Sequence, residues 1–151
     1  MALRERISAE MKEAMKAGDK LRVSTLRLLL SEIKNAEIAK RKELDDEGVL
    51  EVVSREVRKR RESIAEFEKA GREELSSKER IEAQILEAYL PPQLSEEELA
   101  AIVDKALQES GAVSLKEMGK VMALVIPQIK GRAEGKTVNE MVRKALEAKQ
   151  S

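Results

Sequence analysis

The residues with the clearest chemical potential lie in a glycine-flanked loop near the end of the chain, residues 131–137, with the sequence GRAEGKT. The loop comes close to the Walker phosphate-binding loop. That motif, however, requires four residues between its glycines and a preceding strand. Here three residues intervene, the segment before the loop has a helical pattern, and Glu134 would face the phosphates. We therefore predict no nucleotide hydrolysis at this loop.

Positive charge surrounds the loop on both sides. The basic residues on the loop and on the two helices expected to flank it are Lys116, Lys120, Lys130, Arg132, Lys136, Arg143 and Lys144. The loop also leads into the amino-terminus of a predicted helix, where free amides and the helix dipole favour an anion. Such a surface suits contacts with a nucleic-acid phosphate backbone. A plainer interpretation stays open, in which the charges only solubilise the loop and the glycines form a cap and a turn.

The charge of the whole chain balances, with 29 basic and 29 acidic residues. Residues 1–90 carry 20 of each sign, and residues 91–110 carry one basic and five acidic side chains. Residues 111–151 carry eight basic and four acidic side chains and form the only net-positive block. A local basic surface is therefore compatible with a neutral chain.

Several kinds of chemistry lack the residues that they need. The chain has no cysteine and no histidine, which excludes disulfides, thiolate nucleophiles and the commonest metal ligand and general base. We expect no metal, no cofactor and no catalytic residue. Acid–base catalysis by a pair of carboxylates stays open, but no pair stands out among the 29 acidic residues. The longest apolar run, residues 121–126, is far shorter than the about 20 residues that span a bilayer. We expect a soluble, cytoplasmic protein that does not bind membranes.

The composition predicts an all-α fold. Charged residues make up 38% of the chain, glycine and proline are scarce, and Phe67 and Tyr89 are the only aromatic residues. These values favour long helices with an aliphatic core. Apolar periodicity predicts a helix ending at Gly18, a second capped by Asp19, a third over about residues 49–70, and a fourth that starts with a capping box of Ser76 and Glu79.

Two consecutive prolines, Pro91 and Pro92, predict a stiff connector over residues 91–94. We expect a four-helix domain before it, residues 1–90, and a three-helix domain after it, residues 95–151. Capping boxes of the type Ser/Thr-x-x-Glu at positions 95, 114 and 137 predict helices over about residues 96–110, 115–129 and 138–148. We expect Pro127 to kink or end the second of these helices.

A second basic cluster lies in the third predicted helix and comprises Arg55, Arg58, Lys59, Arg60 and Arg61. It has two interpretations. The cluster could form a phosphate-binding stripe. Its basic residues, however, lie three to five positions from glutamates such as Glu56 and Glu62, with which they can form ordinary surface ion pairs. We favour surface pairs.

Short motifs spread over essentially the whole chain have the order and spacing of a known family. They are Asp19-Lys20, Thr25-Leu26-Arg27-Leu28-Leu29, Ser63 with Phe67, Ala70-Gly71-Arg72, Tyr89-Leu90-Pro91, Gln93-Leu94-Ser95, Met118-Gly119-Lys120-Val121-Met122, Pro127, Lys130-Gly131-Arg132, and Gly135 with Val138-Asn139. Together they resemble the YqeY family. The C-terminal unit of that family is similar to the tail domain of the B subunit of the tRNA-dependent Glu/Asp amidotransferase.

The resemblance implies an all-helical fold and a link to tRNA. In the amidotransferase the related tail helps to recognise tRNA, so we expect an accessory protein that binds tRNA or a translation-related enzyme. The candidate contact residues are Lys116, Lys120, Lys130, Gly131, Arg132, Gly135, Lys136, Asn139 and Arg143. One alternative is a protein–protein adaptor that does not bind RNA. Another is the activity that the family label carries, a carbon–nitrogen ligase with glutamine as amido donor. These 151 residues include neither the catalytic cradle nor the glutaminase subunit of that enzyme.

Overall fold

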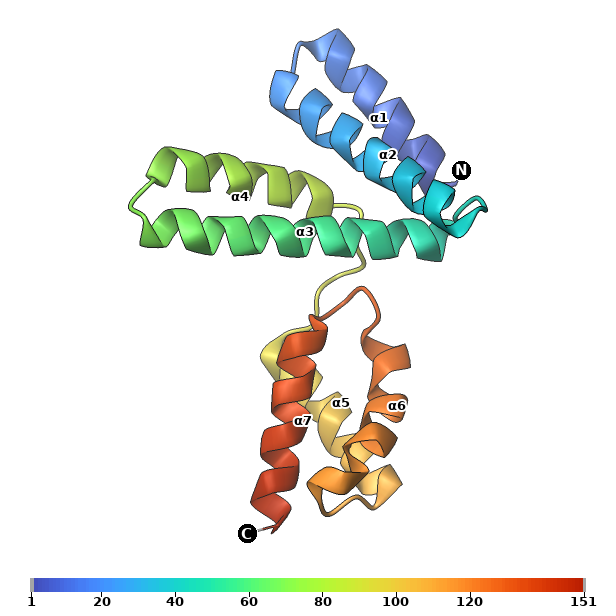
Figure 1. The fold of residues 1–151 in the computed structure, drawn as a ribbon, viewed down its shortest axis with the longest axis vertical. Coiled ribbons are helices and arrows are strands. Elements are labelled where there is room, and N and C mark those ends of the chain that lie inside the picture. Colours follow the sequence, from blue (N-terminus) through green and yellow to red (C-terminus); the bar gives the residue numbers. More distant parts are fainter. Residues whose placement is uncertain (1, 151) are drawn as a thin grey trace. The chain divides into compact units, whose positions relative to one another are not determined.

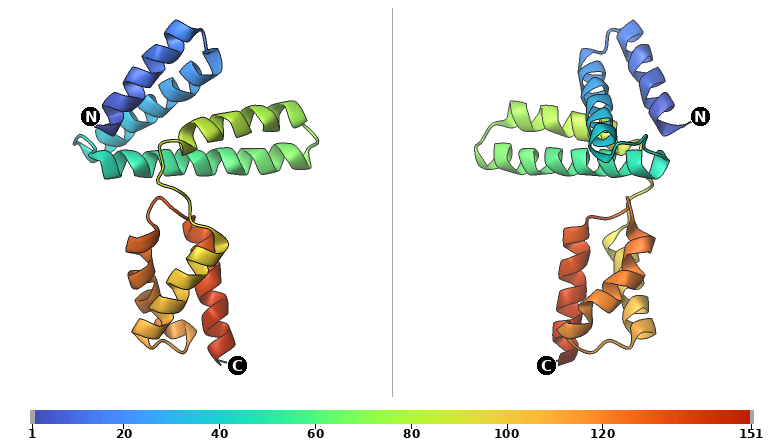
Figure 2. Two further views of the ribbon diagram at one scale, coloured as in Figure 1. Left: turned by 180° about the vertical axis from the view of Figure 1, so that it is seen from behind. Right: turned by 45° about the vertical axis from the view of Figure 1, so that its right-hand side comes forward.

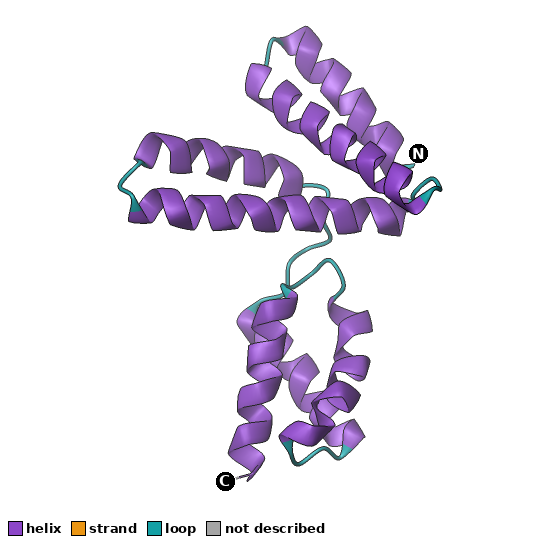
Figure 3. Ribbon diagram, in the orientation of Figure 1, coloured by secondary structure: helices purple, strands orange, loops and turns teal. Residues whose placement is uncertain are grey.

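The computed structural model describes residues 2–150, and over that range the chain is entirely helical, with no strand (Figures 1 and 3). The prediction of an all-α fold is therefore confirmed. The helices are α1 (Leu3–Ala17), α2 (Lys20–Lys40), α3 (Asp46–Lys69), α4 (Glu73–Glu87), α5 (Glu96–Ser110), the 3-10 helix η1 (Leu115–Glu117), α6 (Met118–Ile129) and α7 (Gly135–Gln150). They belong to two compact units, residues 1–90 and 91–151. No helix among the described residues is long and apolar enough to cross a membrane.

The first unit consists of two helical hairpins, α1–α2 and α3–α4 (Figure 2). Gly18 ends α1 in the left-handed region with φ 75°, and the carboxylate of Asp19 then caps α2 by accepting a hydrogen bond from the Arg22 amide. Both features match the sequence prediction. The core between the hairpins is aliphatic, and its most deeply buried side chains are Ile7, Leu26, Leu29, Ile33, Val53 and Leu86.

Two helix starts in the first unit differ from the prediction. Helix α3 begins at Asp46, three residues early, because the carboxylate of Asp45 accepts a hydrogen bond from the Gly48 amide and caps the helix there. Helix α4 begins at Glu73, directly after the turn at Gly71, with two acidic residues in its first turn. Ser76 is therefore buried inside α4, where its hydroxyl donates to the Glu73 carbonyl, and the predicted capping box does not form.

The second unit packs α5, α6 and α7 around valines and leucines, with Val103, Val121, Val125, Val138, Val142 and Leu146 fully or almost fully buried. Its first capping box is confirmed. The Ser95 hydroxyl accepts from the Glu98 amide, and the Glu98 carboxylate accepts from the Ser95 amide, both at 3.1 Å. Gly111 ends α5 in the left-handed region, as its position predicts.

The other two predicted boxes are wrong. Glu117 reaches back past Ser114 to the Val113 amide, so the chain forms the short η1 turn before α6 begins. Thr137 lies inside α7, because the loop already reaches helical geometry at Gly135 and the Val138 amide donates to the Glu134 carbonyl. Helix α6 ends at Ile129, two residues after Pro127, and this end agrees with the predicted range. In the last turn of a helix a proline ring disturbs few remaining hydrogen bonds.

Candidate functional site

The basic loop between α6 and α7, residues 130–134, turns sharply at its start. Lys130 leaves helical geometry with ψ 118°, and Gly131 follows in the left-handed region with φ 74°. The amides of Arg132 and Ala133 then fold back to donate to the carbonyl of Ile129, at 2.7 and 3.2 Å. These bonds satisfy the end of α6 and hold the loop in one conformation.

Hydrogen bonds attach the proline segment to this loop. The Leu94 amide donates to the Arg132 carbonyl at 2.8 Å, and the Gln93 side-chain amide donates to the Gly131 carbonyl at 2.9 Å. The Arg132 guanidinium returns a bond from its Nε to the Pro92 carbonyl at 3.4 Å. Three hydrogen bonds therefore hold residues 91–94 against the basic loop within the second unit. Arg132 also has a structural role that its sequence position did not reveal.

An acidic group lies close to the loop as well. Hydrogen bonds from the Ser95 backbone and side chain hold the pKa of the exposed Glu98 carboxyl below its usual range, and the charge of Arg132 acts in the same direction. The positive potential at Arg132 is therefore partly offset by Glu98. Lys130 and Lys136 are both exposed at the same loop.

Six of the nine predicted contact residues lie together at one end of the second unit, and the other three lie away from it. Lys130, Gly131, Arg132, Gly135, Lys136 and Asn139 lie in the loop and the first turns of α7, and we call these six residues the loop end. Lys116 lies in η1, where the Leu115 amide donates to the Gln150 side chain near the far end of α7. At about 1.5 Å of rise per residue, Lys120 lies about 14 Å along α6 from Ile129, where the loop begins, and Arg143 lies about 12 Å along α7 from Gly135, where the loop ends. All nine are exposed except Gly131 and Arg132, which are half-buried.

In the second basic cluster Arg55, Arg58 and Lys59 are exposed, as the sequence interpretation expected, but Arg60 is buried together with Glu56. Arg60 is 8% exposed and Glu56 is 3% exposed, so neither belongs to a surface pair. The Arg60 Nη1 lies 3.2 Å from Glu56 Oε1, and its Nε lies 3.5 Å from Glu82 Oε2 of α4. We call Glu56, Arg60 and Glu82 the buried ionic cluster. A signal for burial exists in the sequence, because Glu56 and Arg60 continue the helical spacing of the apolar Val49 and Val53.

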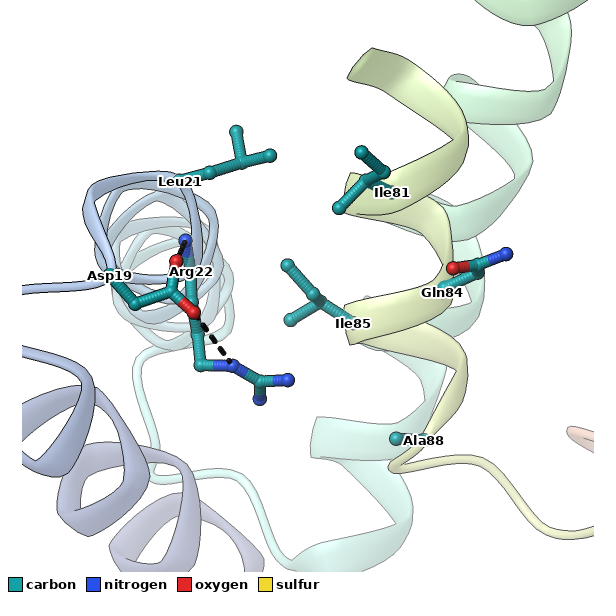
Figure 4. Close-up of a pocket in the computed structure, with 7 residues that line it drawn as sticks. All are labelled: Asp19, Leu21, Arg22, Ile81, Gln84, Ile85 and Ala88. Atoms are coloured by element: carbon teal, nitrogen blue, oxygen red, sulfur yellow. Dashed lines mark hydrogen bonds and ion pairs between the residues drawn. The ribbon is translucent and has the colours of Figure 1, made fainter. Parts of the chain in front are cut away.

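The buried ionic cluster borders a pocket of about 400 Å³ at the junction of three helices. Its lining residues are Ser24, Thr25 and Leu28 from α2, Lys59, Arg60 and Ser63 from α3, and Glu79 and Glu82 from α4. A neighbouring pocket of about 230 Å³ lies farther along α2 and α4. There Ile81 and Ile85 point toward Leu21 and Arg22, and Arg22 pairs with Asp19 (Figure 4). Among residues 2–150, no three carboxylates are grouped closely enough to hold a metal ion.

Comparison with known proteins decides the family. Residues 4–146 match the family described as Yqey-like protein. The chain belongs to the YqeY-like family. The identification made from short motifs is thereby confirmed. Three of these YqeY motif residues, Thr25, Leu28 and Ser63, line the pocket beside the buried ionic cluster, whereas Lys130, Gly131 and Arg132 belong to the loop of the second unit.

Curated relatives of this YqeY-like chain include proteins named "Altered inheritance of mitochondria protein 41, mitochondrial". The one from Eremothecium gossypii is 43% identical over 68% of this chain and 58% of its own length. The one from Kluyveromyces lactis is 38% identical over 87% of this chain and 69% of its own length. A third, from Pyrenophora tritici-repentis, is 30% identical over 95% of this chain and 81% of its own length.

The names of these relatives contradict the cytoplasmic location expected from the sequence, because they describe mitochondrial proteins. The physical reason is that the expectation rested on the absence of cysteine and of a long apolar segment. Both properties describe a protein suited to a reducing aqueous compartment, and they do not distinguish one such compartment from another.

Proposed function

We propose that this YqeY-like protein is an accessory protein that binds tRNA through the loop end of its second unit. The observation that carries the proposal is the exposure of Lys130 and Lys136 on either side of Arg132, in the one net-positive block of the chain. The resemblance of this unit to the tail domain of the tRNA-dependent amidotransferase supports tRNA as the nucleic acid.

The chemistry of such a contact is electrostatic. Lysine and arginine bind phosphate oxygens, which position a nucleic acid without reading its bases. Both aromatic residues of the chain, Phe67 and Tyr89, lie in the first unit, so the loop end offers no ring on which a base could stack. If three phosphates are contacted, a plot of the logarithm of the association constant against the logarithm of the salt concentration should have a slope of roughly −3. Affinity should therefore fall steeply with salt and depend little on sequence.

A mobility-shift titration of tRNA at low salt tests the proposal. We expect the double variant Lys130→Ala with Lys136→Ala to weaken binding strongly. This variant leaves the Arg132 hydrogen bond to Pro92 in place. The matched control is Lys116→Ala with Lys120→Ala, which removes the same charge from the other end of the unit. Absence of binding by the natural chain, or equal losses in the two variants, would refute a tRNA contact at the loop end.

A protein–protein adaptor is the second candidate, and a specific observation favours it. Helix α6 exposes two large apolar side chains next to the loop, with Leu124 36% and Ile126 48% exposed. Leu124 and Ile126 lie on different sides of the helix, and each offers an apolar contact near positive charge that suits docking on a translation-related enzyme. Leu124→Asp with Ile126→Asp should then abolish co-purification of such an enzyme, and a pull-down that recovers no stable partner would count against an adaptor.

We also propose that the two units are independent domains of four and three helices, with the segment 91–94 belonging to the second. The separate apolar cores of the two units support this. A fragment of residues 91–151 should be helical and unfold cooperatively when followed by circular dichroism. A non-helical fragment would show that the second unit depends on the first.

A further inference from the structure

We propose that the pocket bordered by the buried ionic cluster binds a small zwitterion, a molecule that carries an ammonium group and a carboxylate. The pocket lies in the first unit, so this inference is independent of tRNA binding at the loop end. Its lining combines two carboxylates on α4, two cations on α3 and three hydroxyl groups. A volume of about 400 Å³ accommodates a small organic molecule.

The acidic wall of the pocket is suited to an ammonium group. Glu79 and Glu82 lie one turn apart on α4, so their carboxyl groups are neighbours on the same side of the helix. Burial and then the neighbouring charge of Glu82 raise the pKa of the Glu79 carboxyl, while Arg60 and Lys78 oppose this effect more weakly. Two adjacent carboxylates therefore repel each other when both are ionised. An ammonium between them would relieve this repulsion and donate a hydrogen bond to each carboxylate.

The basic wall offers a donor that lacks an acceptor. Arg60 is more than nine-tenths buried and lines the pocket. Its Nη1 donates to Glu56, but its Nε has no hydrogen bond, since Glu82 lies 3.5 Å away as an ion pair only. A buried donor without an acceptor costs free energy. The carboxylate of a ligand could accept from this Nε, with the exposed ammonium of Lys59 close by.

The presence of both signs of charge in the lining distinguishes a zwitterion from simpler ligands. Lys59 and Arg60 are contributed by α3, and Glu79 and Glu82 are contributed by α4. A simple cation would leave the Arg60 Nε unsatisfied, and a simple anion would meet Glu79 and Glu82. The hydroxyls of Ser24 and Thr25 already donate to the Leu21 carbonyl, so they can only accept from the ammonium end, whereas the Ser63 hydroxyl can serve either end.

Three probes test this inference with the full chain, followed by amide chemical shifts in isotope-labelled protein. The probes are 4-aminobutyrate, which carries both charges, ethylamine, which carries only the cation, and acetate, which carries only the anion. We expect 4-aminobutyrate to shift the amides of Ser24, Ser63 and Glu82 saturably and more tightly than the other two. Glu79→Gln should weaken this binding at least about tenfold, since it removes a charge-assisted hydrogen bond.

Two further variants control for folding and for position. Glu74→Gln removes an exposed carboxylate from the same helix and should leave binding unchanged. Leu28→Lys changes an exposed lining residue and places a competing ammonium at the pocket, so it should weaken binding even if Glu79→Gln disturbs the fold. The proposal is overturned if 4-aminobutyrate produces no saturable shift, if ethylamine or acetate binds as tightly, or if Leu28→Lys binds like the natural chain.

Discussion

The two units use charge in opposite ways. In the first unit a guanidinium and two carboxylates form an ion-pair cluster beside a pocket, whereas the core of the second unit is aliphatic and its cations lie outside. The free energy of a buried charge depends on each of its partners, because an unpaired buried ion is costly. The free energy of an exposed charge depends little on its neighbours, so an exposed charge can pair with a ligand instead. Burial, more than residue type, therefore decides what each arginine can do.

The largest expected effect comes from removing the centre of the buried ionic cluster. Arg60→Ala leaves Glu56 and Glu82 without their shared cation and should lower the free energy of unfolding by about 3–5 kcal/mol. The matched control is Arg58→Ala, two residues away and exposed, which should cost under about 0.5 kcal/mol. Urea unfolding of both variants measures the difference. Similar losses would show that the cluster contributes no more than a surface pair.

A second difference between the units concerns high pH. The hydroxyl of Tyr89, the sole tyrosine, is buried in the first unit. Burial, followed by the interaction of the hydroxyl with the Glu10 carboxylate and then by the charge of Glu10, raises the pKa of Tyr89, while Arg22 and Arg6 act in the opposite direction. Arg6 also lies over the ring, 5.1 Å from its centroid. The folded state thus holds this proton more tightly than the unfolded chain.

Because the pKa is raised on folding, this contribution to stability is complete below the unfolded pKa of about 10 and is lost as the pH rises above it. The free energy of unfolding should fall by up to about 1.4 kcal/mol per pH unit above that point. The variant Tyr89→Phe should lose this part of the pH dependence and keep the part due to lysines. Tyrosinate absorbance, which has no tryptophan background here, follows the titration directly. An ordinary tyrosine pKa in the folded chain would contradict the expected burial effect.

The sequence predicted the features that depend on local chemistry. The family, the all-α class, the glycine stop at Gly18 and the capping box at Ser95 all depend on short spacings, and all were correct. Tertiary contacts decided the rest. Glu56 and Arg60 resemble a surface pair in sequence, and only the packing of α4 against α3 buries them beside Glu82. The role of Arg132 depends likewise on a carbonyl forty residues away, at Pro92.

The next effect concerns two glycines at the loop end that differ in backbone conformation. Gly131 has φ 74°, where a side chain is strained, although a Cβ would meet only the Pro91 ring, with Cδ at 3.6 Å and Cγ at 3.9 Å, both ordinary contacts. Gly131→Ala should therefore cost about 1–2 kcal/mol from backbone strain alone. Gly135 begins α7 with open space around it, and Gly135→Ala should stabilise by up to about 1 kcal/mol. Thermal unfolding of the two variants should give shifts of opposite sign. Shifts of the same sign would show that the loop adjusts freely around Gly131.

The smallest expected effect compares two capping sequences that look alike. Ser95 and Glu98 form a reciprocal cap, while Thr137 and Glu140 share the same spacing but lie inside α7. Ser95→Ala removes a bond that satisfies an otherwise free amide and should cost about 1 kcal/mol. Thr137→Ala replaces a β-branched residue in a helix by a better helix former and should cost nothing or stabilise by a few tenths of a kcal/mol. Chemical denaturation of the full-length variants, followed at the second unit, measures the difference between their free energies of unfolding. If Thr137→Ala cost as much as Ser95→Ala, α7 would begin at Val138, as the capping pattern alone had predicted. The loop end would then present its lysines from a longer loop.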